Sequence, residues 1–223
     1  MMQDSVVRLM LTGDNAVFST HLRPFACYEK VVPTLKQADI RFANLEFPLT
    51  KEGAQLDPVK AAIYKDLGLG PWAASRVDIA YVDVLRYAGY DVVGLANNHQ
   101  MDFGAAGFLQ TRETLKSAGI IFCGAGDNAV EARRPVIVER NGVRLAFISF
   151  ATVFPQGAAA TSERPGVASI KVNTSYVSPA PSRIEEQPGT PIEVRTTFDP
   201  QQKEAMLQTI KEARQQADAV ICS

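Results

Sequence analysis

The run Asn97-Asn98-His99, with Asp102 three residues further on, is the part of this chain best equipped for chemistry. It combines amide, imidazole and carboxylate groups, which can hold a divalent metal ion or carry protons. The apolar stretch 90–96 precedes it and predicts a buried strand that ends at these polar residues. Because open α/β sheets bind ligands at the carboxyl ends of their strands, we expect a functional site here.

Two earlier strand ends carry polar groups of the same kind. Asp14 follows the first predicted strand at 6–11, and Asn44 and Glu46 follow the strand predicted at 40–43. Sequential strands are usually neighbours in a sheet, so these groups are expected to converge on one rim. Carboxylate, amide oxygen and imidazole together form a ligand set for divalent manganese, iron or zinc.

Each of these residues also has a purely structural interpretation. Asp14 could cap a turn, Asn97 and Asn98 could stabilise tight-turn backbone, and His99 could be a hydrogen-bonded structural histidine. Asp102 could equally orient His99 from behind or cap the helix that follows it. The grouping of all these residues at predicted strand ends favours the functional interpretation.

Strands and helices alternate along the chain, which predicts a layered α/β fold. The pair Asn141-Gly142 lies between two apolar runs and predicts a two-residue hairpin, so a sheet is expected to be partly antiparallel. Helices are expected at residues 28–37, 82–87, 107–117 and 200–216, the last with Asp199 as its N-cap, and further strands at 120–123 and 219–222.

Periodicity fades across residues 151–197, which contain six of the chain's 13 prolines. This segment is expected to be an irregular insertion or long loop, with a short edge strand at about 168–172. The whole of 1–223 is expected to form a single domain. Residues 215–222 repeat the helix-to-strand arrangement of 36–42 without its polar tip. This indicates an N-terminal fragment whose C-terminal part is missing, or else a natural edge strand.

Composition excludes several classes of partner. Lys and Arg total 23 against 24 for Asp and Glu, so the net charge of −1 favours neither nucleic acid nor an anionic membrane. The sequence has no signal peptide and no run approaching about 18 apolar residues, so the chain as given is expected to be cytoplasmic. The widely spaced Cys27, Cys123 and Cys222 indicate neither a disulfide framework nor a zinc site, and are expected to be buried.

The polar strand ends also carry a family resemblance. The chain resembles the bacterial capsule-synthesis, poly-γ-glutamate CapA-type family from about residue 6 to residue 150. The motifs that carry the resemblance occur in the family's order, and their co-occurrence by chance is improbable. They are Gly13-Asp14, Asn44-Leu45-Glu46-Phe47-Pro48-Leu49, Ala96-Asn97-Asn98-His99, Asp102-Phe103-Gly104 and Gly124-Ala125-Gly126.

The resemblance implies a calcineurin-like metallophosphoesterase fold, and a role in making, exporting or trimming a polyanionic capsule polymer. It implies that Asp14 is the first metal-binding aspartate and that Glu46 stands at the bridging carboxylate. Asn97 or Asn98 would be the metal-binding asparagine, and His99 the catalytic histidine. Two metal ions in such a site activate a water molecule and neutralise a phosphoryl oxygen. Family members are often anchored in a membrane.

The sequence departs from that pattern in three places. The superfamily has Asp-x-His where this chain has Asp14-Asn15-Ala16, and Glu46 replaces an aspartate. The superfamily's later histidines are missing, because the chain contains only His21 and His99. His21 lies in no motif and is expected to be an exposed loop residue. The chain as given is therefore expected to bind metal weakly or not at all.

Two functions remain open at this point. The first is a metal-dependent hydrolase acting on a phosphoester or polyanionic polymer; the second is a non-catalytic polymer-binding or assembly protein with the same fold. Other motif interpretations are weaker. A GDSL-type esterase would need serine at Asn15, and Gly124-Ala125-Gly126 lacks the third glycine of a dinucleotide loop. Trp72 is expected to make a hydrophobic contact rather than line a substrate groove.

Overall fold

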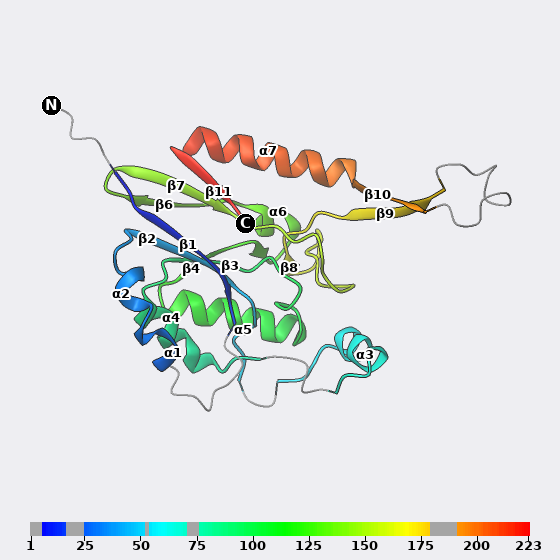
Figure 1. The fold of residues 1–223 in the computed structure, drawn as a ribbon, viewed down its shortest axis with the longest axis horizontal. Helices are drawn as coiled ribbons and strands as arrows, with labels where there is room; N and C mark the ends of the chain where they lie inside the picture. Colours follow the sequence, from blue (N-terminus) through cyan, green and yellow to red (C-terminus); the bar gives the residue numbers. More distant parts are fainter. Residues whose placement is uncertain (1–5, 17–24, 52–53, 71–75, 179–190) are drawn as a thin grey trace.

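The computed structural model describes residues 6–16, 25–51, 54–70, 76–178 and 191–223. Two sheets stack on each other between helices, so the α/β sandwich expected from the sequence is confirmed (Figure 1). The main strands are β1 (Leu9–Asn15), β2 (Ile40–Leu45), β3 (Val92–Gly94), β4 (Ile121–Cys123), β6 (Val136–Arg140), β7 (Val143–Ile148) and β11 (Ala219–Cys222).

The first sheet is parallel and has the strand order β1-β2-β3-β4. One of its faces is covered by helices, as Figure 1 shows, and the other faces the second sheet. The covering helices are α1 (Ala26–Glu29), α2 (Val32–Leu35), α4 (Val82–Ala88) and α5 (Gly104–Ser117). Gly89 ends α4 in the left-handed conformation at φ 82°, which glycine adopts without strain.

Strand β2 shows why the layers form. Successive side chains of a strand point to opposite faces, and β2 is apolar on both. Ile40 and Phe42 pack between the sheets, whereas Ala43 and Leu45 pack toward the helices. The Phe42 ring stacks on Phe147 of β7 with centroids 5.6 Å apart. Burial of each of the larger side chains, Ile40, Phe42 and Leu45, contributes roughly 1.5–3 kcal/mol to folding.

The second sheet has the order β11-β7-β6. Its β6–β7 pair is an antiparallel hairpin that turns at Asn141 (φ 53°) and Gly142 (φ 78°), as the sequence predicted. Strand β11 pairs with β7 in parallel, and the helix α7 (Pro200–Gln216) covers the outer face of the sheet. Asp199 caps α7 by accepting from the backbone N–H of Gln202, again as predicted.

Several predicted boundaries were wrong. β1 begins and ends later than 6–11, so it carries Asp14 within the strand, while β3 is shorter than 90–96. The segment at 28–37 forms two short helices rather than one. Helix α5 begins at Gly104 instead of residue 107, because its first turn follows the polar run directly.

The segment 151–197 is not irregular throughout, which corrects the sequence prediction. It contains β8 (Gly166–Val167), which pairs with β5 (Ala125–Gly126), and β9 (Val172–Val177), which pairs with β10 (Glu193–Phe198). The β9–β10 ribbon extends away from the sandwich in Figure 1 and most of its residues are exposed.

Two smaller elements complete the described chain, α3 (Pro58–Asp66) and α6 (Ala129–Arg133), together with a 3-10 turn at Ile79–Tyr81. No helix among the described residues is both long and apolar enough to cross a membrane. All three cysteines are free, but only Cys123 is buried, so the expectation of burial was wrong for Cys27 and Cys222. His21 and Trp72 lie outside the described residues.

Candidate functional site

Strand register brings the predicted site residues to one rim of the parallel sheet. Asp14 of β1 lies opposite Asn44 of β2, and Asn44 lies opposite Gly94 of β3. The ends of β1 and β2 are tied further, because the Glu46 N–H donates to the Asn15 carbonyl at 3.3 Å. The convergence that the sequence predicted for the ends of these three strands is therefore present.

The first group on the rim, which we call the acidic half, consists of Asp14, Asn44 and Glu46. The Asn44 side-chain amide donates to Asp14 Oδ1 at 2.8 Å and to Glu46 Oε2 at 2.7 Å. Two carboxylates thus approach one neutral amide nitrogen. Within the described part of the chain, neither carboxylate forms an ion pair with a lysine or an arginine. Among the residues that the structure describes, no lysine or arginine therefore balances the negative charge of the acidic half.

A network of buried polar side chains holds the end of β1 in place. Asn15 Oδ1 accepts from the Tyr81 hydroxyl at 2.9 Å, and the Tyr28 and Tyr81 hydroxyls lie 3.2 Å apart. Burial raises the pKa of Tyr28 to about 12 and raises that of Tyr81 further. Both phenols stay neutral hydrogen-bonding groups at physiological pH, so they position Asp14 without adding charge.

Asn97 and Asn98 take part in the turn that follows β3. Asn97 Oδ1 accepts from the backbone N–H groups of His99 at 2.9 Å and Gln100 at 3.1 Å. The Asn97 amide nitrogen donates to Asn44 Oδ1 at 3.0 Å and to the Leu45 carbonyl. The structure thus shows Asn97 orienting the turn and Asn44, while a metal-binding role for Asn97 and Asn98 stays a prediction.

The second group, which we call the buried half, consists of His99, Asp102, Lys60 and Tyr64. His99 Nδ1 lies 2.8 Å from Asp102 Oδ2, and Asp102 is fully buried. Lys60 Nζ lies 2.8 Å from Asp102 Oδ1, and the Tyr64 hydroxyl donates to Asp102 Oδ2 at 3.4 Å. The Asp102 carboxylate does not cap α5: the N-cap residue of this helix is Phe103, which makes no capping side-chain hydrogen bond.

His99 joins the two halves. Its Nε2 atom lies 3.5 Å from Glu46 Oε1, and the Phe47 ring packs edge-on against the imidazole with centroids 4.9 Å apart. When Asp102 is ionised it can only accept at this contact, and the proton of a neutral His99 is then on Nδ1. The Nε2 atom then faces the acidic half as the nitrogen available for proton transfer.

Lys60 and Tyr64 were missed by the sequence interpretation, because they come from α3, far from every motif. The local signal for α3 is present: Asp57 accepts from the Val59 and Lys60 N–H groups, and proline occupies the first turn. Nothing in that signal shows where the helix packs. Burial is the main cause that raises the pKa of Tyr64 to about 12, and the negative charge of Asp102 is the second.

The acidic half fits a divalent cation in donor chemistry and charge, since hard cations select carboxylate and amide oxygens. It fits less well in ligand number. The described residues contain no group of three or more His, Cys, Asp or Glu side chains that could hold a metal ion. Two carboxylates around the Asn44 amide make one face of a cation site, and a complete ligand shell needs further groups.

The sequence matches the family described as "Bacterial capsule synthesis protein PGA_cap" over residues 1–223. It is 32% identical over 139 residues to the capsule biosynthesis protein CapA of Bacillus anthracis, covering 62% of this chain and 32% of that protein. It is 29% identical over 143 residues to the PGA biosynthesis protein CapA of Bacillus subtilis, covering 63% and 34% respectively.

A third relative is a probable polyglutamine synthesis accessory protein of Mycobacterium tuberculosis, 32% identical over 135 residues. That match covers 58% of this chain and 32% of the relative. The chain therefore spans about a third of the length of the curated relatives it matches.

Proposed function

Because the chain belongs to the PGA_cap family of bacterial capsule synthesis proteins, we propose that it acts in the biosynthesis of an anionic capsule polymer such as poly-γ-glutamate, as a metal-dependent hydrolase. The names of the relatives in Bacillus support the biosynthetic part of this proposal. The arrangement at the strand ends supports the hydrolytic part, and the scissile bond would be a phosphoester or a bond of the polymer itself.

One observation carries the hydrolytic proposal: His99 lies between Glu46 and the fully buried Asp102. A histidine oriented by a buried carboxylate through Nδ1 offers Nε2 to a reacting group. When Nε2 takes up a proton, the imidazolium is stabilised by Asp102 and Glu46. Release of that proton to a leaving group completes general acid–base catalysis, which contributes typically about 10²–10⁴-fold to rate.

Asp14 and Glu46 would hold the divalent cations of this site, with Asn97 or Asn98 as a further ligand. Bound cations of this kind supply a hydroxide nucleophile at neutral pH and neutralise developing negative charge. The protein's own contribution is to gather two carboxylates at one point, and to keep His99 beside them in a fixed orientation.

The test combines metal binding with hydrolysis. Titration of the purified protein with Mn²⁺ in a calorimeter is expected to show binding that Glu46→Gln weakens. Hydrolysis of p-nitrophenyl phosphate and of poly-γ-glutamate is expected to require the metal and to fall about 10²-fold or more in His99→Gln. Glu139→Gln, at an exposed position on β6, is the matched control. Full activity of His99→Gln would exclude the proposed role of this residue.

A second function is favoured because the described residues supply the acidic half with an incomplete ligand set. In this alternative, the protein binds or assembles polymer without cleaving it. The same experiment separates the two functions. Binding of poly-γ-glutamate that is unchanged in His99→Gln, together with no metal-dependent hydrolysis, would support the binding protein and contradict the hydrolase.

A further inference from the structure

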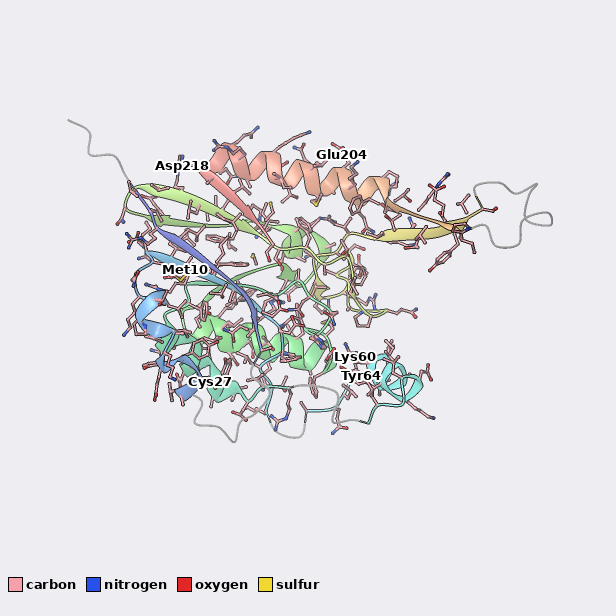
Figure 2. The ribbon with its side chains drawn as sticks, in the orientation of Figure 1. Met10, Cys27, Lys60, Tyr64, Glu204 and Asp218 are labelled. Carbon is pink, nitrogen blue, oxygen red and sulfur yellow. The ribbon has the colours of Figure 1, made fainter. Side chains whose placement is uncertain are left out.

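Helix α3 is attached to the turn that carries His99, although it lies apart from the other helices in Figure 1. Four contacts make the attachment. The Asp57 N–H donates to the Asp102 carbonyl at 2.8 Å, and Lys60 Nζ donates to the Asn98 carbonyl at 3.0 Å. Lys60 also forms the ion pair with Asp102, and Tyr64 donates to the same carboxylate. Figure 2 shows Lys60 and Tyr64 on α3.

The Lys60 ammonium group is buried, which is costly unless the charge is paired. Its side chain is only 7% exposed and that of Asp102 is 0% exposed. One Asp102 oxygen faces Lys60 while the other faces His99. The same buried carboxylate is therefore shared between a fixed positive charge and the candidate catalytic imidazole.

We propose that Lys60 is a positioning residue, which holds the Asp102 carboxylate in place as the hydrogen-bond acceptor of His99 and thereby fixes His99 in the tautomer with its proton on Nδ1. The proposal rests on the proposed function only in taking His99 as the proton carrier. Without the ammonium group, the buried Asp102 carboxylate loses the charged partner that holds it in place, and a buried charge without a partner is costly. Asp102 would then no longer be held as the acceptor for Nδ1, so the imidazole proton can move to Nε2, which removes the acceptor needed at the rim.

Tyr64 provides the matched control within the same helix. It contacts Asp102 as Lys60 does, but it is neutral, because its pKa is raised to about 12 by burial and by the Asp102 charge. A role of α3 as a simple anchor predicts similar effects from loss of either side chain. A role through charge predicts that Lys60 alone controls the tautomer of His99.

The experiment is long-range ¹H–¹⁵N NMR of the imidazole rings at about pH 8.5, where an ordinary imidazole is neutral. The chain contains two histidines, so His21→Gln assigns the His99 signals. The unmodified protein, Lys60→Arg and Tyr64→Phe are expected to show a protonated Nδ1. Lys60→Met is expected to shift the proton to Nε2. A folded Lys60→Met protein with unchanged His99 signals would overturn the proposal.

A second comparison keeps the proposal testable if Lys60→Met does not fold. In Asp102→Asn the carboxylate charge is already absent, so adding Lys60→Met should leave the His99 signals as they are in Asp102→Asn alone. A difference between these two variants would show that Lys60 acts on His99 by another route, and would contradict the proposal.

These spectra are recorded without metal or substrate, so they do not depend on turnover. If the protein is a hydrolase, Lys60→Arg is expected to retain kcat and Lys60→Met to lower it about 10-fold or more, with less change in KM. The expected tautomers in a protein without hydrolase activity would support the role of Lys60 and contradict only the proposed function. A hydrolase that is active, but whose His99 tautomer is unaltered in Lys60→Met, would contradict the role of Lys60 and support the proposed function.

Discussion

The two halves of the site treat their carboxylates differently. In the buried half, Asp102 is fully buried and contacts a lysine, a histidine and a tyrosine. In the acidic half, Asp14 is exposed, Glu46 is partly exposed, and both approach the neutral amide of Asn44. A buried charge is tolerated only when it is paired, whereas an exposed charge is solvated by water and can remain unpaired until a cation binds. The buried half should therefore determine stability, and the acidic half should determine cation binding.

Asp102→Ala breaks the buried half and has the largest expected effect. It leaves the Lys60 ammonium buried without its counter-ion, which costs about 3–5 kcal/mol of unfolding free energy. Urea denaturation measures the loss. Lys60→Met combined with Asp102→Ala should recover a large part of it, because no unpaired charge then remains. A loss below about 1 kcal/mol in the single variant would show that Asp102 is not the counter-ion on which the buried Lys60 depends.

Asn44→Asp makes the acidic half more acidic at its centre. A third carboxylate would replace the amide that now donates to Asp14 and Glu46, so the variant should lose about 2 kcal/mol in EDTA. Because a divalent cation relieves this repulsion, Mn²⁺ should restore thermal stability to the variant more than to the unmodified protein. Equal stabilisation of both proteins by Mn²⁺ would contradict the assignment of cation binding to the acidic half.

Glu46→Gln separates binding from stability. Removal of the partly exposed Glu46 carboxylate should weaken Mn²⁺ binding roughly tenfold or more. The unfolding free energy should change by only about 0.5 kcal/mol. Calorimetric titration and urea denaturation on the same preparation check both parts. A large loss of stability with unchanged metal affinity would assign Glu46 to the framework of the fold.

Tyr64→Phe tests the edge of the buried half and has the smallest expected effect. Its hydrogen bond to Asp102 is long at 3.4 Å, so the loss should be about 0.5 kcal/mol. The pKa of Tyr64 is raised to about 12 from an ordinary value of about 10. The folded state therefore retains this proton longer than the unfolded chain does. Its contribution to stability is complete below about pH 10 and is lost as pH rises toward 12.

Phenolate absorbance measures that pH dependence directly. The unmodified protein should contain a component that titrates near pH 12 and that is reduced in Tyr64→Phe. The remaining late component belongs to Tyr28 and Tyr81, whose pKa values are raised by burial. An identical titration curve for both proteins would show that Tyr64 is not held as the structure describes.

Much of the rim could be predicted from local sequence. The apolar strands and their polar ends predicted that Asp14, Asn44 and His99 converge on one rim, since parallel neighbours present their carboxyl ends together. The hairpin at Asn141-Gly142 and the cap at Asp199 were predicted because each depends on residues adjacent in the chain. The three-residue spacing of His99 and Asp102 likewise allowed their contact to be predicted.

Local patterns failed where contacts are distant in sequence. The β9–β10 ribbon was predicted as irregular, because 151–197 is rich in proline and the strand pairing spans a long connection. The partners of Asn97 could not be predicted either: its amide group bonds to Asn44 Oδ1 and to three backbone groups, while its metal-binding role stays a prediction. Residue type alone does not show which partners satisfy an amide.

The sequence by itself determined the layered α/β fold, the polar strand ends and the family. Tertiary structure alone decided how their charges are balanced. Lys60 lies 42 positions before Asp102, on a helix whose own sequence specifies only that it begins after the cap Asp57. Packing of α3 brings the two charges together. Periodicity and capping act within a few residues, whereas the pairing of buried charges is determined by which distant surfaces exclude water together.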